Sequence, residues 1–203
     1  MPEQNLRADA ARNYRRIVEA AHVVFGRGGV DVPMDEIAAE AGVGIATVYR
    51  RFPSREELVR AVLDQRITQA LTPAMERARE EPDPRKALRL VLDTALALAA
   101  RERITIAVAS NIGMMTMDLA HKVWEPVSTF IKRGQAAGVI RADLVPEDTP
   151  RLMLMLVGTL PSFEPGSDGW RRYLELMLDG LAPRDTDTDL PPALPVRDHN
   201  LAL

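Results

Sequence analysis

The chain has 203 residues, enough for one compact unit or two small domains, and 46% of them are hydrophobic, so it can bury a core. A net charge of −3 excludes a broadly basic nucleic-acid coat protein but not a local basic face. The absence of cysteine excludes disulfides and thiolate metal sites, and it agrees with a cytoplasmic location. There is no apolar run of about 18 residues and the N-terminus is polar, so we expect neither a membrane span nor a secretion signal.

An apolar stripe of helical period predicts a first helix from about Ala10 to Gly28, after a flexible polar arm of residues 1–9. Arginines such as Arg12 cluster in the first turns, where a cation opposes the helix dipole. These arginines are therefore either solvated or placed beside a polyanion. The stripe consists of Ile17, Ala20, Ala21, Val24 and Phe25.

The stretch PMDEIAAEAGVGIATVYRRFPSREEL, Pro33 to Leu58, predicts two short helices joined by a tight turn. Gly42 can take the positive φ that helix C-termini commonly require, and Gly44 opens the second helix. With Val48 and Phe52 pointing inward, the outer face of that helix carries hydroxyl, phenol and guanidinium groups, which suit the major groove of DNA. The alternative is a helical hairpin that has no role in DNA binding. The other inward residues are Met34, Ile37, Ala38, Ala41 and Val43.

A long fourth helix is predicted next, because Ser54 and Glu57 form the S-x-x-E capping box that begins many helices. It is expected to run to about Arg79. From Asp83 the sequence turns apolar and predicts a series of further helices. Residues 183–203 are rich in proline and in acidic side chains, so we expect them to be disordered.

The order of a helix, the tripeptide GGV, the helical pair and a long connecting helix resembles the DNA-binding domain of the TetR family of transcriptional repressors. The resemblance covers about residues 10–65. It implies an all-α fold, in which a three-helix helix-turn-helix domain (residues 10–57) is joined by a long helix to a helical ligand-binding and dimerisation domain (residues 58–182). It also implies a homodimer that leaves its operator in double-stranded DNA when a small molecule binds. We expect no cofactor and no enzymatic activity.

Carried onto this sequence, the family pattern implies phosphate contacts from Thr47 and Tyr49 and contacts to the flanking backbone from Arg50 and Arg55. The tip of the second helix, Gly44 to Ala46, would face the bases but has no polar side chain, so hydrogen-bond readout would rest mainly on Arg51. The sequence departs from the pattern in the apolar character of that tip and in a proline at position 33, where a threonine often contacts phosphate. The expected DNA-binding residues are Arg12, Gly44, Ile45, Ala46, Thr47, Tyr49, Arg50, Arg51 and Arg55.

Methionine adapts to irregular apolar sites, and its frequency in the second half of the chain indicates a pocket for a small hydrophobic effector. The alternative is plain core packing. Asp118, His121 and Glu125 can share one helical face, where a surface charge cluster is favoured over a metal or acid–base site. The candidate ligand-binding residues are Met114, Met115, Met117, His121, Trp124, Phe130 and Met153.

Two late helices each have one apolar face, and two such helices from each of two chains would form a four-helix dimer interface. A twofold dimer would match a palindromic DNA site. The alternative is that both faces close the core of a single chain. The faces consist of Leu152, Met155, Leu156 and Thr159, and of Trp170, Leu174, Met177, Leu178 and Leu181.

The favoured function is a ligand-responsive transcriptional regulator, a repressor released from its operator by a small hydrophobic molecule. A helical small-molecule carrier or adaptor with a vestigial helix-turn-helix is the first alternative, and the apolar base-facing tip gives it some support. A helical enzyme is the second alternative, although the sequence shows no nucleophile motif, phosphate loop or zinc signature.

Overall fold

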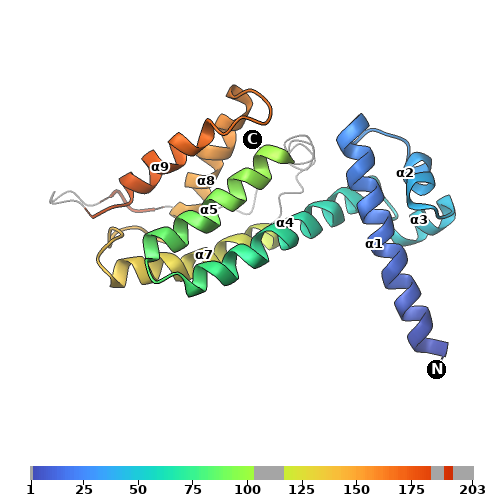
Figure 1. The fold of residues 1–203 in the computed structure, drawn as a ribbon, viewed down its shortest axis with the longest axis horizontal. Helices are drawn as coiled ribbons and strands as arrows, with labels where there is room; N and C mark the ends of the chain where they lie inside the picture. The colour runs from blue at the N-terminus through green and yellow to red at the C-terminus, as the bar shows by residue number, and fades with distance from the viewer. Residues whose placement is uncertain (1, 103–116, 184–189, 194–203) are drawn as a thin grey trace. The chain divides into compact units, whose positions relative to one another are not determined.

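The computed structural model describes residues 2–102, 117–183 and 190–193, with residues 2–8 and 117–126 described by their backbone only. Every regular element within these ranges is helical, which confirms the predicted all-α fold (Figure 1). No helix in the described part of the chain is long and apolar enough to cross a membrane.

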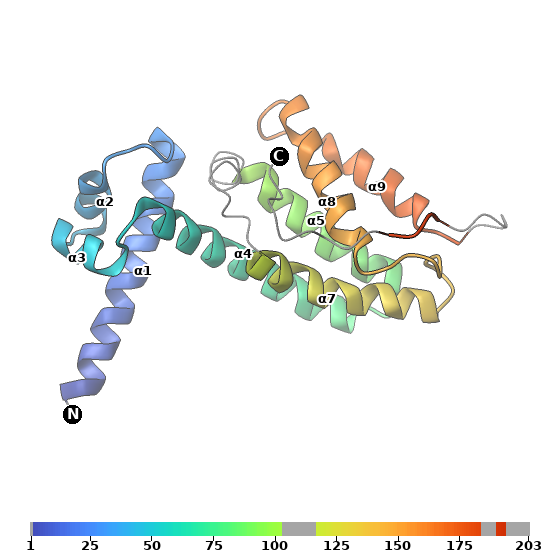
Figure 2. The same cartoon turned by 180° about the vertical axis from the view of Figure 1, so that it is seen from behind.

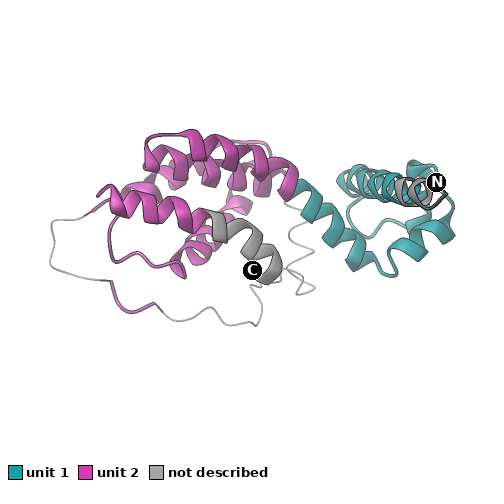
Figure 3. Cartoon of the chain, turned by 90° about the horizontal axis from the view of Figure 1, so that it is seen from below, with its two compact units in different colours: residues 1–66, 103–114 teal, residues 67–102, 115–203 magenta. Residues whose placement is uncertain are grey.

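The chain divides into two compact units, residues 1–66 with 103–114 and residues 67–102 with 115–203 (Figure 3). The division falls inside α4, Arg55–Glu80, so this helix contributes residues to both units. The predicted boundary between residues 57 and 58 lies earlier in the same helix. The reason for the difference is that the first turns of α4 bury Leu58, Val59 and Val62 in the core of the first unit.

The first unit is built from α1 (Pro2–Gly28), α2 (Met34–Ala41), α3 (Ile45–Arg51) and the start of α4, with α2 packed against both α1 and α3. The predicted arm of residues 1–9 is wrong, because α1 begins at Pro2. Proline fits the first position of a helix, where its missing N–H costs nothing, and most of residues 3–9 are good helix formers.

The core of the first unit contains the inward residues that the helical period predicts. Every member of the predicted α1 stripe and of the predicted α2 face is buried, and so are Val48 of α3 and Phe52 directly after it. Val43, which the sequence predicts to point inward, is only half-buried at the edge of this core. The predicted cap of α4 is present, since Ser54 Oγ accepts a hydrogen bond from the Glu57 N–H at 3.2 Å.

The second unit is organised around α5 (Pro84–Arg101), which packs against α7 (Met117–Ala136), α8 (Asp148–Thr159) and α9 (Trp170–Gly180). A short 3-10 turn, Leu160–Ser162, follows α8. The view from behind in Figure 2 shows the same grouping of α5, α7, α8 and α9. Asp83 caps α5 by accepting hydrogen bonds from the N–H groups of Arg85 (2.9 Å) and Lys86 (3.3 Å).

Three ion pairs join α5 to α9, each four residues from the next along both helices. They are Arg85 with Asp179, Arg89 with Glu175, and Asp93 with Arg171. The Asp93 carboxylate accepts from Arg171 Nε at 3.0 Å, and this hydrogen bond raises the pKa of the Arg171 guanidinium. We call these three pairs the α5–α9 ladder.

The two predicted dimer faces differ in burial. On α8 only Leu156 is buried and Met155 is exposed, whereas the face of α9 is buried at Trp170, Leu174 and Leu178, with Leu181 just after the helix. The buried residues close the core of their own chain. The large hydrophobic side chains on α8 and α9 that stay exposed are Met155 (69%), Tyr173 (44%) and Leu176 (55%).

The loop between α7 and α8 is held by polar contacts. Gly138 takes a positive φ of 67°, and Gln135 Nε2 donates to the carbonyl oxygens of Arg141 (3.1 Å) and Leu144 (2.8 Å). Asp143 accepts from Arg141 Nε at 2.6 Å, from a second Arg141 nitrogen at 2.7 Å and from the Leu190 N–H at 3.0 Å. Of the predicted disordered tail, residues 190–193 have no regular structure, while 184–189 and 194–203 lie outside the described residues.

The Arg141 hydrogen bonds hold the pKa of Asp143 far below its usual range. A lowered pKa means that the carboxylate stabilises the fold above its unfolded pKa of about 3.9 and loses this contribution as the pH falls further. We expect Asp143→Asn to lower Tm at pH 7, and we expect the difference in Tm between the variant and the wild type to become smaller below about pH 4. Thermal unfolding between pH 7 and pH 2.5 measures this gap. Asp168→Asn, which removes an exposed partner of Arg171, is the control and should change Tm little.

Candidate functional site

The turn between α2 and α3 sets the direction of α3. Gly42 adopts φ 62° and ψ 39°, and the hydrogen bond from the Val43 N–H to the Ala38 carbonyl (3.0 Å) closes the end of α2. Gly44 is extended, and its carbonyl accepts from the Thr47 N–H at 2.8 Å in the first turn of α3. Because residues other than glycine rarely adopt the Gly42 conformation, this position controls the direction of α3 relative to α2.

The inward side of α3 is fixed by two buried residues. Val48 is fully buried and Phe52 is 3% exposed, and both belong to the core of the first unit. The Phe52 ring contacts the ring of Tyr14 on α1, with centroids 5.3 Å apart. Burial of these two side chains leaves the opposite side of α3 facing outward.

The outward side of α3 is apolar and cationic. Ile45 is 40% exposed and Tyr49 50% exposed, one turn apart, beside the exposed Ala46 and Arg50. Thr47 is half-buried, and α3 contains no acidic residue. Such a surface offers methyl and ring contacts, a phenol hydroxyl and guanidinium donors, which match thymine methyl groups, phosphate oxygens and base edges.

Arg51 lies over the Tyr14 ring, with its guanidinium carbon 4.7 Å from the ring centroid. Stacking of this kind uses the flat face of the guanidinium and leaves the N–H groups at its rim able to donate. Tyr14 therefore joins the site as a support for Arg51. The sequence does not reveal this role, because Tyr14 belongs to a different helix far away along the chain.

Two of the expected DNA-binding arginines have partners within the first unit. Arg55 is half-buried and donates to the carbonyl oxygens of Val30 and Val32, so it fixes the connection between α1 and α2. The exposed Arg12 is paired with Asp9 on its own helix. Arg16, which is absent from the expected set, donates to the Gly42 carbonyl at 3.3 Å and links α1 to the turn before α3.

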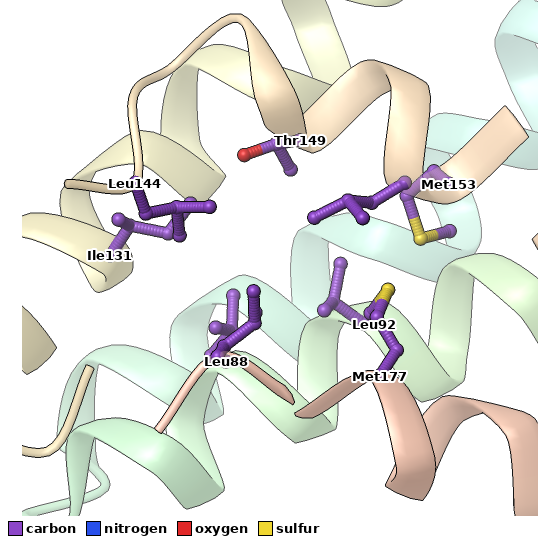
Figure 4. Close-up of a pocket in the computed structure, with 9 residues that line it drawn as sticks. Leu88, Leu92, Ile131, Leu144, Thr149, Met153 and Met177 are labelled. Atoms are coloured by element: carbon purple, nitrogen blue, oxygen red, sulfur yellow. The ribbon is translucent and has the colours of Figure 1, made fainter. Parts of the chain in front are cut away.

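A cavity in the second unit is lined by side chains from α5, α7, α8, α9 and the α7–α8 loop (Figure 4). Its empty volume is about 240 Å³, which includes open solvent. All but one of the lining side chains are apolar, and the exception is Thr149 at the start of α8. The lining residues are Leu88, Leu92, Ile131, Leu144, Thr149, Leu152, Met153, Met177 and Leu181.

The cavity shares one residue, Met153, with the candidate ligand-binding set. Phe130 is buried but does not line the cavity. Met114 and Met115 lie outside the described residues, and so do the side chains of Met117, His121 and Trp124. The Asp118, His121 and Glu125 cluster falls in the same part of the chain. Among the described residues, no group of three or more His, Cys, Asp or Glu side chains could hold a metal ion.

The first unit carries the strongest likeness to known proteins. Residues 17–62 match the model of the bacterial regulatory proteins of the tetR family. An HTH-type transcriptional regulator from Staphylococcus aureus is 37% identical over 68 residues, which are 33% of this chain and 37% of the relative. The chain thus spans about a third of the length of the curated relatives it matches.

Solved structures extend the likeness to both units. The TetR transcriptional regulator from Streptomyces coelicolor is 28% identical, with a TM-score of 0.59 over 84% of this chain and 98% of that chain. The TetR transcription regulatory protein from Mycobacterium vanbaalenii is 29% identical, with a TM-score of 0.58 over 87% and 99%. AibR, solved with isovaleryl coenzyme A and operator DNA, is 19% identical and shares the fold, with a TM-score of 0.59 over 84% and 98%. Residues 17–62 therefore resemble the bacterial regulatory proteins of the tetR family, and both units share the fold of TetR regulators of known structure.

Proposed function

We propose that this chain is a transcriptional repressor that binds a palindromic operator as a homodimer and leaves it when a small hydrophobic molecule binds. The observation that carries the proposal is the outward side of α3, where Ile45, Tyr49 and Arg50 are exposed on a helix without acidic residues. A helix of this size fits the major groove, and its lack of carboxylates avoids repulsion by phosphate. We expect it to act in the cytoplasm without a cofactor or catalytic activity.

We infer that sequence is read mainly by shape and methyl contacts at the tip of α3. Gly44, Ile45 and Ala46 lack polar side-chain groups, so they would contact thymine methyl groups and let the backbone approach closely. Arg51 would provide the hydrogen bonds to a base edge, held in place by Tyr14. Thr47, Tyr49 and Arg50 would contact phosphates, which position the helix without reading sequence.

The proposed homodimer uses the large exposed apolar residues of α8 and α9, of which Met155 belongs to the faces predicted from the sequence. Met155, Tyr173 and Leu176 are large apolar side chains that α8 and α9 leave in solvent. Pairing them with their copies would remove this surface from water, and a twofold axis would then present two α3 helices to a palindromic site.

The ligand response is proposed to pass through α4, because this helix contributes residues to both units. A ligand releases DNA only if it binds the DNA-incompetent arrangement more tightly than the competent one. Two recognition helices must stay about 34 Å apart on DNA, so a small change in the position of α4 would be enough to misalign one of them. The neighbour AibR, solved with both an acyl-coenzyme A and operator DNA, supports this type of response.

The first test of the proposal is selection of bound fragments from the host genome, with retention that falls as salt rises. On the operator so identified, we expect Arg51→Ala to weaken binding by about 1–3 kcal/mol. We also expect it to reduce the difference in affinity between operator and random DNA. Tyr49→Phe should weaken both affinities alike, because a phosphate contact carries no base identity.

Fluorescence anisotropy with operator and scrambled duplexes measures both affinities. Arg27→Ala, which removes an exposed cation paired with Glu40 outside α3, is the matched control and should keep the gap unchanged. An equal loss of both affinities in Arg51→Ala would show that Arg51 does not read a base.

The dimer is tested by placing a charge in the exposed apolar set. We expect Leu176→Glu to weaken dimerisation at least about tenfold. A tenfold change corresponds to about 1.4 kcal/mol, and burial of one unpaired carboxylate costs more than this. Light scattering across a dilution series measures the dissociation constant. Leu190→Glu changes an exposed leucine outside α8 and α9 and should have no effect. A monomeric wild type at micromolar concentration would contradict the proposal.

A further inference from the structure

The hydroxyl of Thr149 is the one polar side-chain group that lines the cavity of the second unit. Thr149 is 6% exposed, and its Oγ1 has no hydrogen-bond partner within the part of the chain that the structure describes. Figure 4 shows this side chain among those of Leu144, Met153 and Leu88, at the edge of the apolar space. A buried hydroxyl without a partner is a group that a ligand atom can satisfy.

The position of Thr149 in its helix explains why its hydroxyl stays unsatisfied. Threonine inside a helix usually bonds back to a carbonyl one turn earlier, as Thr94 does to Leu90 (2.8 Å) and Thr159 to Leu156 (2.7 Å). Thr149 is the second residue of α8, so the residues one turn before it belong to the loop and offer no helical carbonyl. Valine would fill the same space without a buried hydroxyl, so core packing alone does not favour threonine here.

From this geometry we propose that the Thr149 cavity binds a small uncharged molecule that is mostly apolar and has one hydrogen-bonding group, such as a short-chain alcohol or ketone. The lining side chains hold no ionisable group, so a carboxylate or an ammonium group would be buried without a counter-charge. Thr149 Oγ1 would bond the polar group of the ligand, and the leucines and methionines would surround its chain.

The size of the cavity limits the ligand to a short one. Its empty volume of about 240 Å³ includes open solvent, so an occupant has less room than this figure. Met153 and Met177 are flexible and unbranched, so their side chains can shift to admit a chain of a few carbon atoms. A sugar or nucleotide would leave many polar groups unpaired in this lining.

This inference rests on the proposed function, because it names the class of effector that the regulator would sense. The cavity lies among α5, α7, α8 and α9, so an occupant would contact every helix that α5 packs against in the second unit. Binding at the cavity is nevertheless a property of this unit alone and can be measured without DNA.

The test is a titration of the full-length protein with 1-hexanol and with hexanoate, followed by NMR shifts of the methionine methyl groups. We expect 1-hexanol to bind the wild type more tightly than hexanoate, with the largest shifts at Met153 and Met177. Thr149→Val should weaken 1-hexanol binding about fivefold, because the hydrogen bond is lost while the shape is kept. Thr149→Ser keeps the hydroxyl and should retain most of the affinity.

Thr159→Val is the matched control, because it removes a hydroxyl from the same helix that is bonded internally and does not line the cavity. Its affinity for 1-hexanol should equal that of the wild type. Without ligand, Thr149→Val should raise Tm by about 2–4 °C, whereas Thr159→Val should not. Equal 1-hexanol affinity in Thr149→Val and the wild type, or tighter binding of hexanoate, would overturn the proposal.

The two proposals fail in different ways. If operator fragments are retained but 1-hexanol does not bind, the cavity is not a ligand site and the regulator senses its effector elsewhere. If 1-hexanol binds through Thr149 but no DNA fragment is retained, the ligand site stands and the repressor function fails.

Discussion

Burial of Val48 and Phe52 beneath α3 is the constraint on which the proposed reading surface depends. A helix of two turns has little stability of its own, so its orientation comes from packing. Because Phe52 also contacts Tyr14, and Tyr14 supports Arg51, one aromatic contact links the core to the reading side chain. Loss of a buried Phe typically costs about 3–5 kcal/mol, a large part of the 5–15 kcal/mol that stabilises most domains, so α3 and the fold depend on the same packing.

The first unit follows from its sequence because its determinants are local. Helical period identifies the inward residues, glycine marks the turn at Gly42, and the S-x-x-E pattern marks the start of α4. What the pattern cannot show is how an arginine on the surface is used. Arg51 and Arg55 are both candidate DNA contacts by their position in the sequence. In the fold, Arg51 lies over Tyr14, whereas Arg55 donates to the carbonyls of Val30 and Val32, and these partners lie on distant parts of the chain.

The second unit is less predictable because an apolar helical face does not say what covers it. The face of α9 around Leu174 and Leu178 packs inside its own unit, and the exposed residues Tyr173 and Leu176 lie between the buried positions. The sequence does not reveal the cavity either. Its methionine content points to residues 114–124, whereas the unpaired hydroxyl of Thr149 is apparent only from the tertiary structure. Both features depend on contacts among helices that are far apart in sequence.

The charge order of the α5–α9 ladder has a consequence for the alignment of α9. Arg85, Arg89 and Asp93 face residues 179, 175 and 171 in turn. If α9 slipped by one turn, Arg89 would meet Arg171 in one direction, and in the other Asp93 would meet Glu175. The apolar face of α9 repeats every turn and would tolerate either slip. The exposed ion pairs contribute little to stability, so their main effect is to make one register of α9 preferable to its neighbours.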